Sequence, residues 1–226
     1  NSAAAAANLQ PGDVLLAVDD LTIDRQGYID HPLYKRLFWN HQIHGPKTIG
    51  ENVNLDILRD GSTQSITATL TRSNPQDALI PPYTYGHAPR YLVKGGMIFQ
   101  ELTQPLLSAF GDNWTSRAPL NLLDPWENPD KYRDDYDRIV FLSGVIATPA
   151  TVGYERLRNV IIEEINGQPI RDIPSLIAAF AKVPASGHHT INFRDEDLDI
   201  YLDELLSSQV DTQLLQRGLP KLSRAK

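Results

Sequence analysis

The sequence of 226 residues contains no cysteine. This absence excludes disulfide bonds, thiolate zinc sites and cysteine nucleophiles. Basic residues are also in the minority, because 21 Lys and Arg stand against 28 Asp and Glu and give a formal net charge of -7. An acidic chain of this kind is not suited to bind a nucleic-acid backbone or an anionic membrane as its main partner.

Long apolar runs are missing as well. No run approaches the length needed to span a bilayer, and Ala3–Ala7 is too short, with too few basic residues before it, for a signal peptide. What is present is ordinary for a soluble globular protein: 41% of the residues are hydrophobic and 22% are charged. The length suits one or two domains.

Residues 9–23 contain the clearest pattern in the sequence. Pro11-Gly12-Asp13 is a strong turn signal. The apolar run Val14–Val18 is too short for a helix and predicts a buried strand. Asp19-Asp20 then predicts a second turn, after which Ile23 begins a new apolar entry.

This pattern recurs in residues 154–170. Ile161–Ile165 aligns with Val14–Val18, and Asn166-Gly167 aligns with Asp19-Asp20. Each copy is followed by a candidate helix and then by a strand that ends at a charged turn. The repeat predicts two copies of one structural unit.

Residues 9–23 resemble the strand–turn segment of PDZ domains, especially those of HtrA/Deg serine proteases. Asp20 stands where that family usually has glycine, and Asp tolerates a left-handed backbone better than most residues. The resemblance implies an α+β fold with two PDZ-like units, each a small, partly open β-barrel or sandwich with flanking helices.

The first unit is expected over residues 1–72. The family places a strand and a carboxylate-binding loop before a short helix at this point, and Ser2–Ala7 suits that helix with Ser2 as its cap. We therefore expect the first unit to lack its N-terminal strands in this chain. A helix opening at Asp30-His31-Pro32 is expected to border a peptide groove, and residues 39–50 are expected to form a loop. Residues 73–90 contain four prolines and predict a linker.

The second unit is expected over residues 91–203. Tyr91–Phe99 resembles a PDZ carboxylate-binding loop followed by the strand that borders the groove. Successive N–H groups at Gly95-Gly96 can hold a terminal carboxylate, and a free strand edge beyond them can pair with an extended peptide. Lys94 would add attraction for the carboxylate. The expected peptide-binding residues here are Lys94, Gly95, Gly96, Met97, Ile98 and Phe99. The alternative is that Gly95-Gly96 is a plain turn between two strands.

A helix over Pro174–Lys182 is expected to form the other wall of this groove. Leu176, Ile177 and Phe180 are spaced to lie on one face of it. The alternative is that this face packs into the core. The pair His188-His189 precedes a strand and is expected to be solvated.

Three segments together resemble the C-terminal half of plant-type Deg proteases and their bacterial relatives: Tyr91–Leu107, Ile139–Tyr154 and Arg217–Pro220. In that branch the second PDZ unit carries a large insertion, which residues 103–138 would form here. A short helix is expected over Pro105–Phe110 within it. Residues 204–226 are expected to form a C-terminal helix and tail.

Two metal patterns fail on inspection. Asp195, Asp197 and Asp199 begin like a calcium loop, but the sixth position is Ile200 instead of glycine. His41 and His44 have a spacing compatible with zinc, but no third ligand is evident. No Gly-Asn/Asp-Ser-Gly-Gly nucleophile turn occurs. We therefore expect no catalytic residue, no metal and no cofactor in this chain.

The resemblance implies a tandem PDZ region of an HtrA/Deg serine endopeptidase, with a trypsin-like protease domain upstream. Its partners would be C-terminal or unfolded segments of protein substrates, as in protein quality control, and homo-oligomers are expected. A periplasmic location is implied if the source is bacterial. Two alternatives stay open: a stand-alone PDZ scaffold, and a purely structural module for oligomer assembly.

Overall fold

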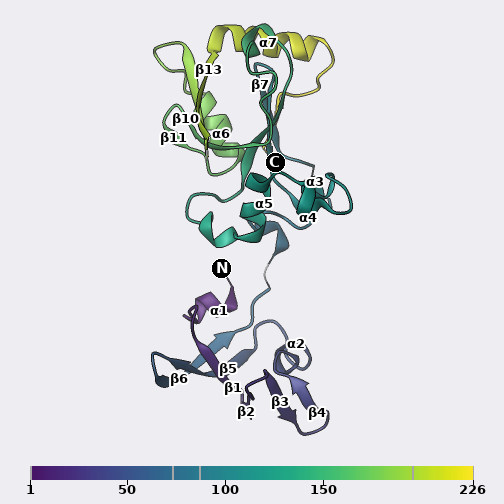
Figure 1. The fold of residues 1–226 in the computed structure, drawn as a ribbon, viewed down its shortest axis with the longest axis vertical. Coiled ribbons are helices and arrows are strands. Elements are labelled where there is room, and N and C mark those ends of the chain that lie inside the picture. Colours follow the sequence, from purple (N-terminus) through teal and green to yellow (C-terminus); the bar gives the residue numbers. More distant parts are fainter. Residues whose placement is uncertain (1, 73, 87, 195, 226) are drawn as a thin grey trace. The chain divides into compact units, whose positions relative to one another are not determined.

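The computed structural model describes residues 2–72, 74–86, 88–194 and 196–225. The chain divides into two compact units, Asn1–Asn74 and Pro75–Lys226, which are referred to here as unit 1 and unit 2 (Figure 1). Each unit combines helices with antiparallel sheets, so the predicted α+β class is confirmed.

Unit 1 consists of a four-stranded sheet, a separate hairpin and two short helices. Its elements are α1 (Ala3–Ala6), β1 (Val14–Val18), β2 (Leu21–Thr22), β3 (Tyr28–His31), β4 (Lys35–Phe38), α2 (His41–His44), β5 (Asn52–Arg59) and β6 (Ser62–Thr69). The sheet has the order β2-β1-β5-β6, and β3 pairs with β4. Its buried core consists of Val18, Ile29, Val53, Leu55 and Ile57. The expected cap of α1 is confirmed, because the Ser2 hydroxyl accepts from the Ala5 N–H at 3.2 Å.

The helix predicted to open at Asp30-His31-Pro32 is wrong, because this segment forms the β3–β4 hairpin. The turn depends on His31, whose Nδ1 accepts from the N–H groups of Leu33 and Tyr34. Across the hairpin, the rings of Tyr28 and Phe38 meet edge to face with centroids 5.8 Å apart. Such cross-strand aromatic pairs stabilise a hairpin and outweigh the helix-start signal of the proline. The region expected as a loop, residues 39–50, contains α2.

Unit 2 is built on a large antiparallel sheet. Its strands are β7 (Tyr91–Lys94), β8 (Met97–Glu101), β9 (Val140–Val145), β10 (Val160–Ile165), β11 (Gln168–Pro169), β12 (His188–Phe193), β13 (Glu196–Asp203) and β14 (Ser223–Arg224). Their order is β13-β12-β10-β9-β8-β7-β14, with β11 paired to β10.

Helices lie at both ends of this sheet and against its strands. They are α3 (Gln104–Ser108), α4 (Trp114–Arg117), α5 (Leu120–Glu127), α6 (Ile173–Phe180) and α7 (Glu204–Gln216), with single 3₁₀ turns at η1 (Pro75–Asp77), η2 (Pro129–Lys131) and η3 (Pro149–Thr151). Figure 1 shows α7 across one end of the strands and α3, α4 and α5 gathered at the other end. The helix expected over 174–182 and the C-terminal helix expected within 204–226 are therefore present, as α6 and α7. The β12–β13 hairpin directly precedes α7.

The structure repeats where the sequence repeats. In unit 1, β1 pairs with β2 and β5, and in unit 2, β10 pairs with β11 and β12. The register of pairing shifts between Leu15 and Ala17 in the first copy and between Ile162 and Glu164 in the second. These are aligned positions, so both copies contain the same irregularity. In the first turn the left-handed residue is Asp19, with φ of 49°, and not Asp20 as expected.

Unit 2 has two apolar cores on opposite sides of its sheet. One lies under α6 and α7 and includes Phe99, Leu142 and Ile162. The other is formed by the region expected as an insertion, residues 103–138, against Phe141 and Ile161. Leu79 and Ile80, from the segment expected as a linker, are buried in this second core. The contact pattern accordingly groups residues from Pro75 onward with unit 2.

No helix in the described ranges combines the length and the apolar character that crossing a bilayer requires.

Candidate functional site

The turn between β7 and β8 lies at the predicted carboxylate-binding loop. Lys94 pairs with Met97, so Gly95 and Gly96 are the two residues of a tight hairpin turn, with φ of 61° and 102°. A Cβ on Gly95 would lie 2.7 Å from the Cβ of Ser207, and one on Gly96 would lie 2.9 Å from the Ile146 carbonyl oxygen. Both positions therefore require glycine, for backbone conformation and for space.

The turn binds a carboxylate of the chain itself, that of Asp211. The N–H of Gly95 donates to Asp211 Oδ1 of α7 at 2.7 Å, and this hydrogen bond is buried. The two turn carbonyls are also bonded: Gly95 accepts from Thr148 Oγ1 at 2.8 Å, and Gly96 accepts from the Ile146 N–H at 2.8 Å. The place expected for a ligand carboxylate at Gly95 is filled by an internal one.

Lys94 points into the molecule between acidic side chains of α7. Its Nζ lies 2.9 Å from Glu204 Oε2 and 3.5 Å from Asp211 Oδ2, and its side chain is only 13% exposed. Two carboxylates compensate its charge at short range, so little of that charge acts on an approaching ligand. Lys94 thus anchors α7 to the end of β7.

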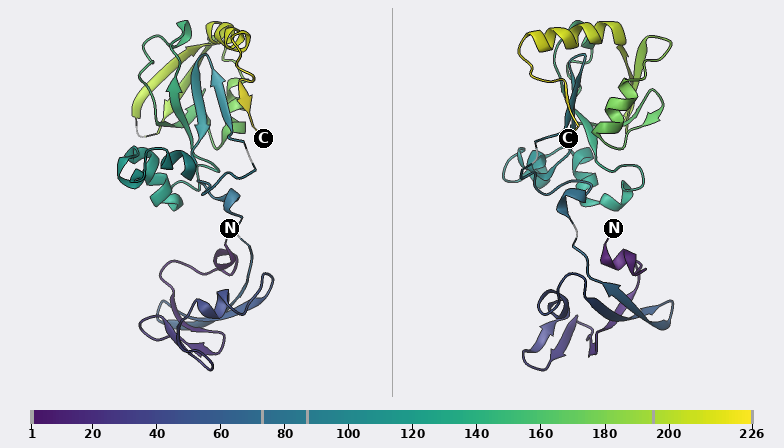
Figure 2. Two further views of the ribbon diagram at one scale, coloured as in Figure 1. Left: turned by 90° about the vertical axis from the view of Figure 1, so that its right-hand side faces the viewer. Right: turned by 180° about the vertical axis from the view of Figure 1, so that it is seen from behind.

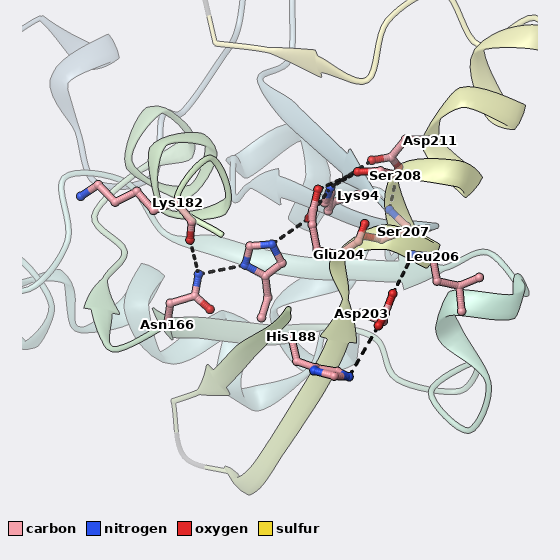
Figure 3. A network of polar contacts seen from close by, with 12 residues as sticks. Lys94, Asn166, Lys182, His188, Asp203, Glu204, Leu206, Ser207, Ser208 and Asp211 are labelled. Atoms are coloured by element: carbon pink, nitrogen blue, oxygen red, sulfur yellow. Dashed lines mark hydrogen bonds and ion pairs between the residues drawn. The ribbon is translucent and has the colours of Figure 1, made fainter. Parts of the chain in front are cut away.

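Glu204 connects Lys94 to the buried His189. Figure 3 shows Glu204 beside Lys94 and Ser208. Desolvation tends to raise the pKa of Glu204, but hydrogen bonds from Lys94, Ser208 and His189 outweigh it and lower the pKa to about 2. His189 is fully buried, and its Nε2 lies 2.8 Å from Glu204 Oε2. The expectation that His189 is solvated is wrong.

Asn166 orients the histidine from the other side. Its Nδ2 lies 2.9 Å from His189 Nδ1, while its Oδ1 accepts from the Thr190 N–H at 3.0 Å. The amide nitrogen must donate, so Nδ1 accepts and Nε2 carries the hydrogen that it donates to Glu204. A continuous chain of polar contacts therefore runs from the turn after β10 to the turn after β7. We call it the polar relay; its members are Asn166, His189, Glu204, Lys94, Asp211 and Gly95.

Asp211 differs from Glu204 in the balance of these forces. Burial raises its pKa above the ordinary value, and the Gly95 N–H and Lys94 only partly oppose this. The ionised carboxylate is therefore held at an energetic cost. Asp211 is hydrogen-bonded, but burial disfavours its ionised form. The contact between α7 and the β7–β8 hairpin therefore depends on the ionisation state of Asp211.

The apolar residues predicted to line the groove are brought together by the fold. Met97, Phe99, Leu176 and Phe180 belong to one buried core, with the rings of Phe99 and Phe180 at 5.6 Å. All four side chains are buried. Ile98 and Ile177 are half-buried. Whether any of these residues binds a peptide stays a prediction.

The expectation that β8 has a free edge is wrong. Its residues pair with β7 on one side and with β9 on the other. The strand Tyr91–Lys94 lies beside β8, and α6 packs against both strands. The backbone at Gly95-Gly96 is a turn between two strands, which was the alternative interpretation.

The polar relay does not have the geometry of a serine hydrolase. Ser208 Oγ and His189 Nε2 both contact Glu204, whereas a catalytic triad places the histidine between the serine and the carboxylate. Within the described ranges, no three His, Asp or Glu side chains are grouped to hold a metal ion.

Asp211 and Glu204 are the residues that the sequence interpretation missed. Asp211 lies 116 positions from Gly95 and carries no motif of its own. The available signal was indirect, since α7 follows β13 without a loop and must return across the sheet.

Comparison with known proteins agrees with this architecture. Residues 80–218 match the PDZ domain family. The chain is 28% identical over 169 residues to "Protease Do-like 2, chloroplastic" of Arabidopsis thaliana, covering 74% of this chain and 26% of that protein. It is 24% identical over 168 residues to "Protease Do-like 4, mitochondrial" and 22% identical over 168 residues to "Putative protease Do-like 3, mitochondrial" of the same plant, covering 74% of this chain in both cases and 29% and 27% of those proteins. The chain thus spans just over a quarter of the length of these relatives. The expected resemblance to HtrA/Deg proteases is confirmed, and the chain belongs to the PDZ domain family.

Proposed function

We propose that this chain is the tandem PDZ region of a Do-like serine endopeptidase, and that it selects extended or unfolded segments of protein substrates. The observation that carries the proposal is the similarity to three Do-like proteases across 74% of the chain, together with the PDZ family match to unit 2. PDZ domains bind peptides by adding a strand to a sheet edge.

Catalysis is assigned to a trypsin-like domain upstream of Asn1, by analogy with the proteases that the chain resembles. The test is to read the native reading frame before this position. A nucleophile turn of the form Gly-Asn/Asp-Ser-Gly-Gly supports the proposal. An upstream segment that contains only PDZ strands overturns it and favours a stand-alone scaffold.

Peptide binding to unit 2 is tested by titrating two fluorescent peptides that share an apolar last residue, one with a free carboxylate and one amidated. If the Gly95 N–H receives the ligand carboxylate, Asp211 must leave it first. Asp211→Ala then raises the affinity for the free acid and not for the amide. Asp130→Ala, at a side chain that is 96% exposed, is the matched control. Equal affinity of acid and amide for both proteins overturns the assignment of Gly95 as the carboxylate site.

One observation favours a second function, a structural module for oligomer assembly. Four of the side chains expected to line the groove, Met97, Phe99, Leu176 and Phe180, are buried in one core. Under this alternative no peptide binds, and light scattering of the whole protein shows an oligomer that depends on unit 2. Saturable peptide binding by a monomeric chain rejects it.

A further inference from the structure

The outer edge of β7 is occupied by the chain's own C-terminal segment. The Val93 N–H donates to the Leu222 carbonyl at 2.7 Å, and β14 continues the pairing with Ser223 opposite Leu92 and Arg224 opposite Tyr91. Figure 2 shows β14, in yellow, beside β7, in blue. Residues 221–224 are called the tail strand here. Its last two residues, β14, form the added strand at the end of the sheet order.

Side-chain contacts of Tyr91 and Arg224 also attach the tail strand. The Tyr91 hydroxyl donates to the Lys221 carbonyl at 3.1 Å, and the guanidinium of Arg224 lies 5.5 Å from the centre of the Tyr91 ring. Arg224 Nη1 also lies 3.5 Å from the Pro89 carbonyl. A cation over an aromatic face at a partly exposed site adds only a weak attraction. These side-chain contacts to the tail strand are individually weak.

The edge beneath it is much firmer. β7 is bonded to β8 along its whole length, and Leu92 and Val93 are buried. A two-residue strand separated from α7 by the turn at Gly218 opens at low free energy, while β7 stays in the sheet. Opening leaves a row of unpaired N–H and C=O groups, which pairs readily with another extended chain.

We propose that the β7 edge is the peptide-accepting edge of unit 2, and that the tail strand is its resident occupant. The ligand that replaces it is an extended segment of another protein with the tail's own pattern, an apolar residue followed two positions later by Arg or Lys. The aromatic face of Tyr91 selects the cation, and the net charge of -7 attracts a basic segment over longer range. This inference rests on the proposed function in one respect, that unit 2 binds peptide segments.

Recognition at this edge does not require a chain terminus. The Leu222 carbonyl is an internal backbone group, so an amidated or embedded segment binds as well as one with a free carboxylate. This separates the β7 edge from the Gly95 turn, where a free carboxylate is needed.

The test uses a fluorescent peptide with the sequence of residues 219–225, acetylated and amidated. It is titrated into the full chain and into a chain ended after Gly218. A tethered tail acts at an effective concentration of about 1 mM, so its removal is expected to raise the affinity at least tenfold. Equal affinities, or no binding to the shortened chain, overturn the proposal.

Two variants of the full chain test the proposal even if the shortened chain does not fold. Arg224→Glu removes the cation from Tyr91 and is expected to raise peptide affinity several-fold. Lys221→Glu changes the net charge equally at an exposed side chain and is the control, expected to have no such effect. If both variants behave alike, the cation on Tyr91 does not hold the tail and the proposal fails.

Hydrogen exchange at the Val93 amide reports the tail without any ligand. Faster exchange after removal of residues 219–226 supports occupation of the edge, and unchanged exchange overturns it. If the Val93 amide exchanges faster but no peptide binds, the claim that another protein segment replaces the tail is overturned. The titration with the acid and amide peptides tests the proposed function separately. A dimer of full chains that dissociates on shortening would show that the occupant is a second copy, which overturns the claim of a partner protein.

Discussion

Asp19 and Asn166 occupy the same place in the two units. Each follows the apolar strand, has a left-handed backbone, with φ of 49° and 54°, and accepts an N–H from the neighbouring strand through its side-chain oxygen, from Asn54 at 3.1 Å and from Thr190 at 3.0 Å. The two differ in charge. Asp19 is paired with Lys47 at 3.0 Å, whereas the neutral amide of Asn166 faces the buried His189.

Asn166→Ala is expected to destabilise unit 2 by about 2–4 kcal/mol. The change leaves the Thr190 N–H and His189 Nδ1 without their partners and puts a Cβ-bearing residue without a compensating side chain in the left-handed region. Urea denaturation followed by circular dichroism measures the loss. Asn166→Gly is the companion variant, because it removes the same hydrogen bonds without the backbone strain. It should be the more stable of the two by about 1 kcal/mol, and the reverse order would contradict the strain argument.

Asp211→Ala is expected to cost about 1–3 kcal/mol, because the Gly95 N–H stays buried without an acceptor. Asp211→Asn keeps an acceptor oxygen and removes an ion whose pKa is raised by burial. It should therefore change the free energy of unfolding by less than the alanine variant does. Thermal and urea unfolding of the two variants decide the point, and equal losses would show that the charge, and not the hydrogen bond, is what matters.

Acidification is expected to weaken unit 2 through Glu204. Its pKa is about 2 in the fold and 4.5 ordinarily, so its contribution is complete above pH 4.5 and is lost as the pH falls toward 2. Asp211 acts in the opposite direction, since its raised pKa makes proton uptake favour the folded chain. Glu204→Gln should flatten the dependence of unfolding free energy on pH over this range. The exposed Glu127→Gln should leave the curve of the parent protein unchanged, and a curve that Glu204→Gln does not alter would contradict the role of the relay.

Gly96→Ala is expected to destabilise unit 2 strongly, because its Cβ would meet the Ile146 carbonyl at 2.9 Å and Thr148 at 2.8 Å. Gly167→Ala is also at positive φ, 70° against 102° at Gly96, but a Cβ there has nothing within 4 Å. It isolates the conformational strain of about 1 kcal/mol. The difference between the two unfolding free energies measures the close packing of the hairpin turn. Equal losses would show that space at Gly96 is not limiting.

The insertion is tested with two leucines of one helix. Leu122 is fully buried in the second core, while Leu120 is 83% exposed. Leu122→Ala is expected to cost about 2–5 kcal/mol, and Leu120→Ala close to nothing. If the costs are alike, residues 103–138 do not form a core that contributes to the stability of unit 2.

The sequence predicts best those elements whose signals are local. The repeated strand and turn, the Ser2 cap, α6 and α7 depend on residues close together in the chain, and they are found where expected. The β3–β4 hairpin was missed because Asp30-His31-Pro32 carries a helix-start signal, while the pairing of Tyr28 with Phe38 depends on residues ten apart.

The candidate site was predicted only in part, for a related reason. Gly95 and Gly96 predict a turn with N–H groups that can donate to a carboxylate. No residue near them in the sequence indicates which carboxylate accepts these hydrogen bonds. Asp211 reaches Gly95 only because α7 packs against β7. In the same way, β14 on β7 joins positions some 130 residues apart, which no periodicity reveals.

The antiparallel pairing of β14 with β7 also has a mechanical consequence. A force applied beyond Arg224 pulls the tail away from Tyr91 and loads the ladder from its end, so that its hydrogen bonds break one after another and not all together. The ion pairs of Lys94 with α7 are loaded only after the tail has peeled off. Tension from the C-terminal side is therefore expected to release unit 2 in two steps, the edge first and the helix second.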